Sequence, residues 1–401
     1  MPSRAELLLL REAVLVLVLG LGGCDLESPP AEPLVTPQLV EVQVTIGYDE
    51  GAPIRTRLDE SRRPSSVSRA TTIVLRFDRF LHPASVLRQA ICLRPSTEPV
   101  DTLDDCARPG QPFLQPRYLP AQRQVVYQLP PGERLSPDTL YRLTLFPPTE
   151  DSDFGFRAFD GAPLRRHYRF DLVTASEDAA AIEEPQPTPS RYCDALRCAG
   201  QCRDDPSLRD DPVAQRGCIA DRCDCLDPDC TADGDLTDPS EGIFATSCAF
   251  GGCHAGGDAA TGIPWGTAGA AMGLDLGAPD AIAATAIGKA AHQAQTGERA
   301  AVAEVNGVPF GRAMPIVAPS NPGNSYLLYK LIARRHNHGQ QPDGPLDAEL
   351  ERLRASVVTG QPMPPDDALL GSASDPDGRR AWERLLLFEA WIAHGAVTAC
   401  D

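Results

Sequence analysis

The most constraining feature of this chain of 401 residues is its 13 cysteines. An odd number of cysteines cannot all pair within one chain, so at least one thiol has a different role. The hydrophobic fraction of 42% is sufficient for ordinary buried cores, and the length indicates more than one domain. The cysteines are unevenly spread, because one short stretch holds Cys193, Cys198, Cys202, Cys218, Cys223, Cys225 and Cys230.

The N-terminus offers a role for the odd cysteine. Residues 13–21 are apolar and are soon followed by Cys24. A membrane-spanning helix needs about 20 apolar residues, so this shorter run predicts a signal peptide over residues 1–23. The tetrapeptide Leu-Gly-Gly-Cys that ends at Cys24 resembles the lipobox of bacterial lipoproteins. The resemblance implies a lipid on Cys24, attachment to a membrane and a place in the bacterial cell envelope. An ordinary signal peptide with an incidental cysteine is the alternative.

Export implies an oxidising compartment, where the other cysteines are expected to form disulfides. Cys92 and Cys106 lie in the same region of the chain and are predicted to pair with each other. The seven clustered cysteines predict a disulfide-rich segment over residues 192–236. Zinc is the alternative ligand for these sulfurs, but the segment contains no histidine. Because seven is odd, one of these cysteines needs a partner outside the segment, and Cys400 is the candidate.

The charge balance excludes one class of partner. The chain has 55 acidic and 37 basic residues, which gives a net charge of −18. Binding to nucleic acid depends on basic residues that neutralise phosphates, so no nucleic-acid partner is expected. The sequence also lacks the nucleophile, zinc-hydrolase and phosphate-binding motifs of common enzymes. An electron carrier or a binding module is therefore favoured over an enzyme.

Residues 39–175 have the pattern of antiparallel β-structure. Apolar and polar residues alternate along the first predicted strand, and the residues expected on its buried face are Val40, Val42, Val44 and Ile46. Turn residues separate the further strands, which are predicted at 72–77, 125–129, 141–146 and 167–173. Short strands separated by turns are typical of a β-sandwich. The acidic, Pro-rich residues 24–38 and 176–191 predict a tether before this domain and a linker after it.

Three segments of this region resemble the bacterial Ig-like domains of surface-layer type. The strand at 73–78 with Leu81 and Pro83 is similar to the opening of that family's pattern. Residues 135–144 are similar to its central hairpin, and residues 159–164 with Phe170 and Thr174 to its closing strand. The resemblance implies an Ig-like sandwich that acts as a spacer or an interaction module and carries no catalytic residue.

Residues 237–401 contain a motif with its own chemistry, in which Cys248 and Cys253 precede His254. Attachment of haem c uses two thiols, which add to the vinyl groups of the porphyrin, and a histidine that follows the second thiol and binds the iron. The usual motif has two residues between the cysteines, whereas four stand here. The glycines at 251–252 allow the longer connection to bulge. A simple disulfide between Cys248 and Cys253 is the alternative.

The second half of the chain offers a further iron ligand in Met363. It lies in the Pro-rich sequence Gly-Gln-Pro-Met-Pro-Pro at 360–365, which suits a rigid loop that holds a thioether. A second Met-Pro pair begins at Met314. A helix is expected after residue 325, and a C-terminal helix with one mostly apolar face is expected over 381–393, ending at Gly395.

Two other groups of ligand-type residues are not expected to bind metal. The acidic residues 229–235 loosely follow the spacing of a calcium loop, but Ser240 stands where that loop requires a bidentate glutamate. His336 and His338 supply two ligands at most, which makes an incomplete site on a basic turn.

In their order along the chain, four motifs resemble a bacterial cytochrome c-like domain. They are the Cys–Cys–His motif and residues 319–327, 360–364 and 391–396. The resemblance implies a mostly α-helical domain in which Cys248 and Cys253 hold haem c through thioethers. It also implies that His254 and Met363 bind the iron, a ligand pair that favours electron transfer.

The sequence thus predicts a multidomain chain: an all-β Ig-like sandwich, a Cys-rich segment and a mostly α cytochrome c-like domain. The predicted function is that of an exported, lipid-anchored electron-transfer protein with one c-type haem on an Ig-like spacer. Its partners would be the membrane, through the lipid on Cys24, and a redox protein. The alternative function is that of a haem-free, disulfide-stapled envelope or surface module that acts through protein contacts.

Overall fold

The computed structural model describes most of the first half of the chain after the predicted tether and part of the second half. The described residues are 35–49, 52–60, 66–98, 100, 102–106, 112–148, 154–176, 206–207, 274, 279–291, 304–305, 308–311, 313–333, 347–356 and 379–396. The contact pattern assigns Thr36–Asp401 to one compact unit. Among the described residues, no helix combines the length and the apolar character that crossing a bilayer requires.

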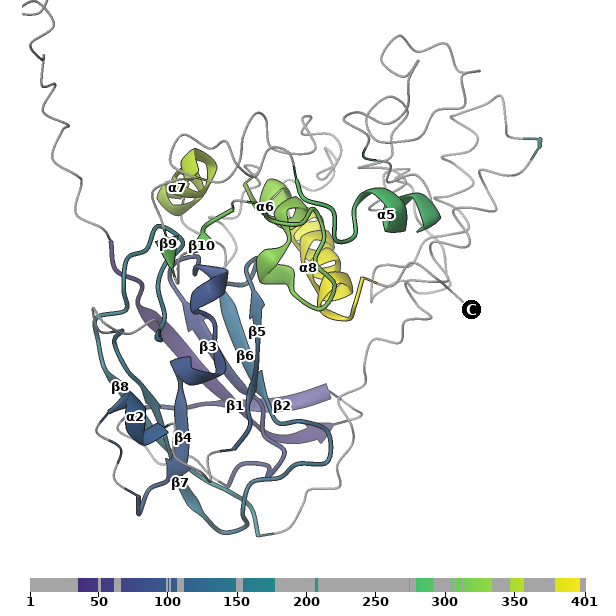
Figure 1. The fold of residues 1–401 in the computed structure, drawn as a ribbon. Helices are drawn as coiled ribbons and strands as arrows, with labels where there is room; N and C mark the ends of the chain where they lie inside the picture. The colour runs from purple at the N-terminus through teal and green to yellow at the C-terminus, as the bar shows by residue number, and fades with distance from the viewer. Residues whose placement is uncertain are drawn as a thin grey trace, which may run out of the picture. The chain divides into compact units, whose positions relative to one another are not determined.

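The described part of residues 39–175 forms two antiparallel sheets (Figure 1). The larger sheet has the strand order β2-β1-β3-β6-β5, with strands β1 (Leu39–Asp49), β2 (Ala52–Arg57), β3 (Ile73–Phe77), β5 (Gln115–Leu119) and β6 (Gln124–Gln128). The smaller sheet has the order β4-β7-β8, with β4 (Cys92–Pro95), β7 (Leu140–Leu145) and β8 (Tyr168–Val173). The predicted all-β character of this region is confirmed, and each predicted strand agrees with an observed one to within a few residues.

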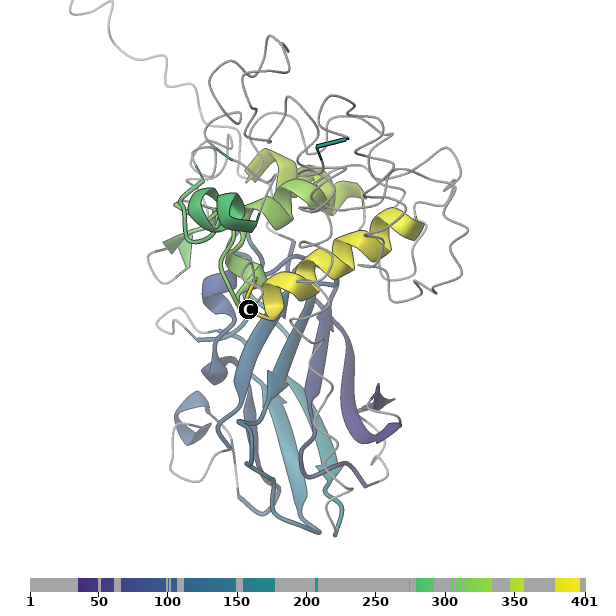
Figure 2. The same ribbon diagram turned by 90° about the vertical axis from the view of Figure 1, so that its right-hand side faces the viewer.

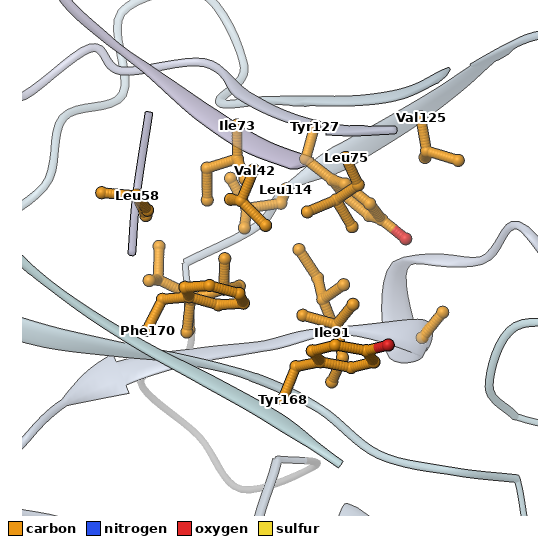
Figure 3. Packing of buried hydrophobic residues seen from close by; sticks show 14 of the residues in the cluster. Val42, Leu58, Ile73, Leu75, Ile91, Leu114, Val125, Tyr127, Tyr168 and Phe170 are labelled. Carbon is orange, nitrogen blue, oxygen red and sulfur yellow. The ribbon is translucent and has the colours of Figure 1, made fainter. Parts of the chain in front are cut away.

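Apolar side chains from both sheets fill the space between them. In Figure 3, Val42, Leu75 and Tyr127 from the larger sheet point toward Tyr168 and Phe170 from the smaller one. All five are nearly inaccessible to solvent. Burial of one such side chain stabilises a fold by about 1.5–3 kcal/mol, so this cluster is the main source of stability for the two sheets.

The first strand departs from the predicted alternation at both ends. Near its C-terminal end Thr45 is buried and Ile46 is only partly buried, beside a register shift between Thr45 and Gly47. Val42 and Val44 are buried as expected, but Val40 is 40% exposed. The register between β1 and β3 shifts between Leu39 and Glu41, which marks a β-bulge. An extra residue at a bulge turns the next side chain to the other face of the sheet, and this explains the exposure of Val40.

The predicted disulfide between Cys92 and Cys106 is present, with the two Cα atoms 5.5 Å apart. It joins β4 to the short helix α2 (Leu103–Cys106) and is packed against Val100 and Phe146. A bond that closes a loop of 14 residues stabilises a domain by about 3 kcal/mol. It therefore fastens the least regular part of the β-structure to the smaller sheet.

The described residues beyond 274 are mostly helical. They comprise α5 (Pro279–Thr285), the strand pair β9 (Glu304–Val305) and β10 (Val308–Pro309), the 3-10 turn η6 (Pro322–Asn324), α6 (Tyr326–Ile332), α7 (Asp347–Ser356) and α8 (Arg379–Ala393). Helices α6 and α8 lie side by side (Figure 2). They agree with the helices predicted after residue 325 and over 381–393.

A second hydrophobic cluster joins these helices to the β-structure. Its members from the helices include Leu328, Leu353 and Phe388, and its members from the loops between the strands are Phe80, Ala121 and Phe159. Because one core contains side chains from both regions, the described helices do not have a core that is separate from the sheets.

Candidate functional site

The residues predicted to bind haem lie outside the described residues, as does the predicted lipid site, Cys24. The haem set is Cys248, Cys253, His254 and Met363. The disulfide candidates other than Cys92 and Cys106 also lie outside the described residues. They are Cys193, Cys198, Cys202, Cys218, Cys223, Cys225, Cys230 and Cys400. Two of the four motifs that resemble a cytochrome c-like domain do lie in described segments. Residues 319–327 belong to the segment 313–333, and residues 391–396 belong to the segment 379–396.

These two motifs meet through backbone and side-chain contacts. The backbone N–H of Ser320 donates to the carbonyl oxygen of Ile392 over 2.8 Å. The Ser325 hydroxyl, which is fully buried, accepts from the N–H of Ala318 over 2.9 Å and so holds the loop before α6 closed. Gly395 ends α8 with φ of +101°, a conformation that glycine adopts without steric cost. Two segments about 70 residues apart in sequence are thus joined into one structure.

The turn η6 approaches β5 more closely than a side chain at Gly323 would permit. A Cβ atom added at Gly323 would lie 2.6 Å from Cδ1 of Tyr118. Tyr118 cannot easily move away, because it is buried and its hydroxyl accepts from the N–H of Leu81 over 2.7 Å. On the other side of the turn, the Tyr329 hydroxyl donates to the carbonyl oxygen of Gly323 over 2.8 Å. Glycine at this position is therefore a packing requirement.

Substitution of Gly323 by alanine is expected to lower the free energy of unfolding by about 1–3 kcal/mol, because overpacking forces side chains or backbone to shift. Thermal unfolding of the full chain, followed by circular dichroism, measures the effect. The matched control is Gly47→Ala, since a Cβ atom at Gly47 would meet nothing within 4 Å. Equal midpoints for the two variants would contradict the close contact between η6 and Tyr118.

A buried ion pair joins helix α7 to the loop that follows β3. Arg79 is 2% exposed and Glu349 is 1% exposed, and Nε of Arg79 lies 3.0 Å from Oε2 of Glu349. The same guanidinium also pairs with Asp160 over 2.8 Å. Glu349 accepts from the backbone N–H of Phe80 over 3.0 Å and from Nε of Arg352 over 2.9 Å. Each charge is thus paired and hydrogen-bonded, which is the condition under which buried charges are tolerated.

A second buried carboxylate joins α8 to the turn between β5 and β6. Glu389 is fully buried, and it accepts from the backbone N–H of Ala121 over 2.7 Å and from Nε2 of Gln122 over 2.9 Å. Burial raises the pKa of Glu389 to about 7, although both hydrogen bonds act in the opposite direction. Burial also places the pKa of the Tyr118 hydroxyl far above its ordinary value.

The arrangement of these groups favours a structural role. Within the described ranges, no group of three or more His, Cys, Asp or Glu side chains is placed to hold a metal ion. The two buried carboxylates instead accept hydrogen bonds from the loops of the β-structure. Sequence reasoning did not find Arg79 or Glu349, since nothing in the local pattern marks them. Glu389 did leave a signal, because a carboxylate stands on the apolar face predicted for the C-terminal helix.

Comparison with known proteins gives no family assignment. No protein-family model matches the chain, and no curated protein matches it either. The resemblances to a lipobox, to an Ig-like domain and to a cytochrome c-like domain therefore rest on the motifs quoted above.

Proposed function

We propose that this protein is an exported, lipid-anchored electron carrier that binds one c-type haem in its C-terminal region. One observation supports the proposal most. Residues 319–327 and 391–396, two of the four ordered motifs, share one buried core and a direct backbone hydrogen bond. Motifs that belong to one domain are expected to fold together, whereas chance matches have no reason to meet.

The chemistry of the predicted ligands fits the cofactor. Cys248 and Cys253 supply two thiols for thioether bonds, His254 supplies an imidazole and Met363 supplies a thioether. When bound, haem supplies a one-electron couple between ferrous and ferric iron. The His254 and Met363 side chains would both bind the iron, and this ligand pair would favour electron transfer over oxygen chemistry.

The described contacts support a role for the β-structure beyond that of a spacer. Gln38, the last residue of the predicted tether, donates its backbone N–H to Oδ1 of Asp78 over 2.7 Å. The next residue, Arg79, makes the ion pair with Glu349 of α7. The predicted tether and the helices therefore reach the β-structure at neighbouring residues.

Production of the full chain in a host with c-type haem maturation enzymes tests the proposal. Covalent haem is expected to remain with the protein after denaturation and to give a pyridine haemochrome spectrum with one haem per chain. The variant Cys248→Ser/Cys253→Ser is expected to lose it, because both thioethers are removed. The control Cys92→Ser/Cys106→Ser removes a disulfide of the β-structure and is expected to keep the haem.

Absence of covalent haem from the wild-type protein would contradict the proposal. It would favour the second candidate, a haem-free envelope module stapled by disulfides. Two observations favour that candidate: the four-residue spacing between Cys248 and Cys253, and the disulfide between Cys92 and Cys106.

A further inference from the structure

Glu389 is an acidic group placed where an ionised carboxylate is poorly stabilised. Its side chain has no exposure to solvent. Its hydrogen-bond partners in the described part of the chain, the Ala121 N–H and the Gln122 amide, are both uncharged. An ion that leaves water without a counter-charge loses hydration that two neutral hydrogen bonds replace only in part. The interface between α8 and the β5–β6 turn is therefore sensitive to the protonation of one residue.

Among the described residues, the ionisable groups around Glu389 do not offset its charge. Tyr118 from β5 and Tyr329 from α6 interact with it electrostatically. Both phenols are buried and have raised pKa values, so they stay neutral over the physiological range. Arg123, the last residue of the turn, and Glu349 on α7 act on Tyr118 with opposite signs.

Two further charged groups among the described residues lie toward the C-terminal end of α8. There, burial lowers the pKa of His394, and the positive charge of Arg117 on β5 lowers it further. These two groups therefore act on each other, and His394 adds no positive charge near neutral pH.

Protonated Glu389 can keep both contacts with the turn. One oxygen still accepts from the backbone N–H of Ala121. The other becomes an O–H donor, and it can donate to the side-chain oxygen of Gln122 once that amide has turned over. The neutral acid therefore retains two hydrogen bonds and avoids burial of a charge. The ionised form retains two hydrogen bonds but pays for desolvation.

The direction of the pH effect follows from the raised pKa. An unperturbed glutamate side chain has a pKa of 4.5, and burial in the folded protein raises the pKa of Glu389 to about 7. Between these values the folded state holds a proton that the unfolded state has lost. The stabilisation is thus fully present below about pH 4.5, and it is lost as the pH rises through about 7.

We propose that the contact of α8 with the β5–β6 turn is a pH-responsive device, which tightens when Glu389 takes up a proton and loosens when it releases one. An envelope protein that faces the external medium would meet pH changes in this range. The inference rests on the burial and the contacts of Glu389 and does not require haem or a lipid.

Hydrogen exchange of the full chain, measured by mass spectrometry between pH 5.5 and 8.0, tests the device. After correction for intrinsic rates, the wild-type peptides that cover α8 and the β5–β6 turn are expected to open more at high pH. Loss of one proton permits an increase of up to about tenfold per pH unit between pH 5.5 and about 7, and the increase is expected to level off above that pH. Glu389→Gln imitates the neutral acid and is expected to show no such increase. The control Glu351→Gln removes a carboxylate that is 50% exposed on α7 and is expected to behave as the wild type.

An equal pH response in the wild type and in Glu389→Gln would overturn the inference. If Glu389→Gln does not fold, a carboxyl titration of the wild-type protein alone still tests the inference. In protein labelled with ¹³C in the glutamate side chains, one carboxyl signal is expected to titrate with a midpoint near 7. Titration of every glutamate below about pH 5.5 would overturn the inference, since no glutamate would then hold a proton across the neutral range.

Discussion

Replacement of Glu349 by glutamine is expected to lower the free energy of unfolding by about 3–5 kcal/mol. The substitution removes the charge opposite Arg79, whose guanidinium is 2% exposed and keeps Asp160 as its remaining partner among the contacts described. A buried charge that loses one partner retains its desolvation penalty and loses part of the attraction that offset it. Chemical denaturation of the full chain at pH 7 measures the change.

Two further variants distinguish the stability effect of the buried ion pair from that of a charge at the surface. Glu351→Gln removes a carboxylate of the same helix that pairs with Arg354 at the surface, and it is expected to change stability by less than about 1 kcal/mol. Arg79→Met/Glu349→Gln removes both buried charges and is expected to be more stable than Glu349→Gln alone. If Glu349→Gln were no more harmful than Glu351→Gln, the ion pair would not be what holds α7 to the β-structure.

The β-structure was largely predictable from the sequence because its signals are local. Alternating apolar residues, turn residues and β-branched side chains act within a few positions, and they located β1, β3, β6, β7 and β8. Strands β2, β4 and β5 were not predicted. The bulge beside Val40 was not predicted, since it depends on how β1 pairs with β3. The disulfide between Cys92 and Cys106 was predicted because few other partners lie nearby in the sequence.

The junction between the helices and the β-structure could not be predicted in the same way. Arg79 and Glu349 are 270 residues apart, and each would be an ordinary surface residue in its local context. Only the fold brings them together. Gly323 is similar, because its requirement for glycine comes from the ring of Tyr118 on a distant strand. Glu389 was visible as a carboxylate on an apolar helix face, but its partners, Ala121 and Gln122, were not.

Substitution of Met363 by leucine is expected to abolish the methionine-to-iron charge-transfer absorption of the oxidised, haem-loaded protein. The proposed electron carrier has two Met-Pro pairs, and the structure describes one of them. Met314 is 3% exposed within the shared core, and its carbonyl oxygen accepts from the N–H of Ala291 over 2.9 Å. These contacts give Met314 a packing role, which leaves Met363 as the proposed iron ligand.

The matched control is Met314→Leu, which nearly conserves side-chain volume and is expected to lower stability by less than about 1.5 kcal/mol. It should leave the charge-transfer absorption unchanged, because the Met314 side chain lies in a hydrophobic core. Haem content from the pyridine haemochrome spectrum allows the two variants to be compared per bound haem. An unchanged absorption in Met363→Leu would contradict the ligand assignment. Loss of the charge-transfer absorption in Met314→Leu instead would make Met314 the iron ligand. The second hydrophobic cluster, which contains Met314, would then form one wall of the cofactor site.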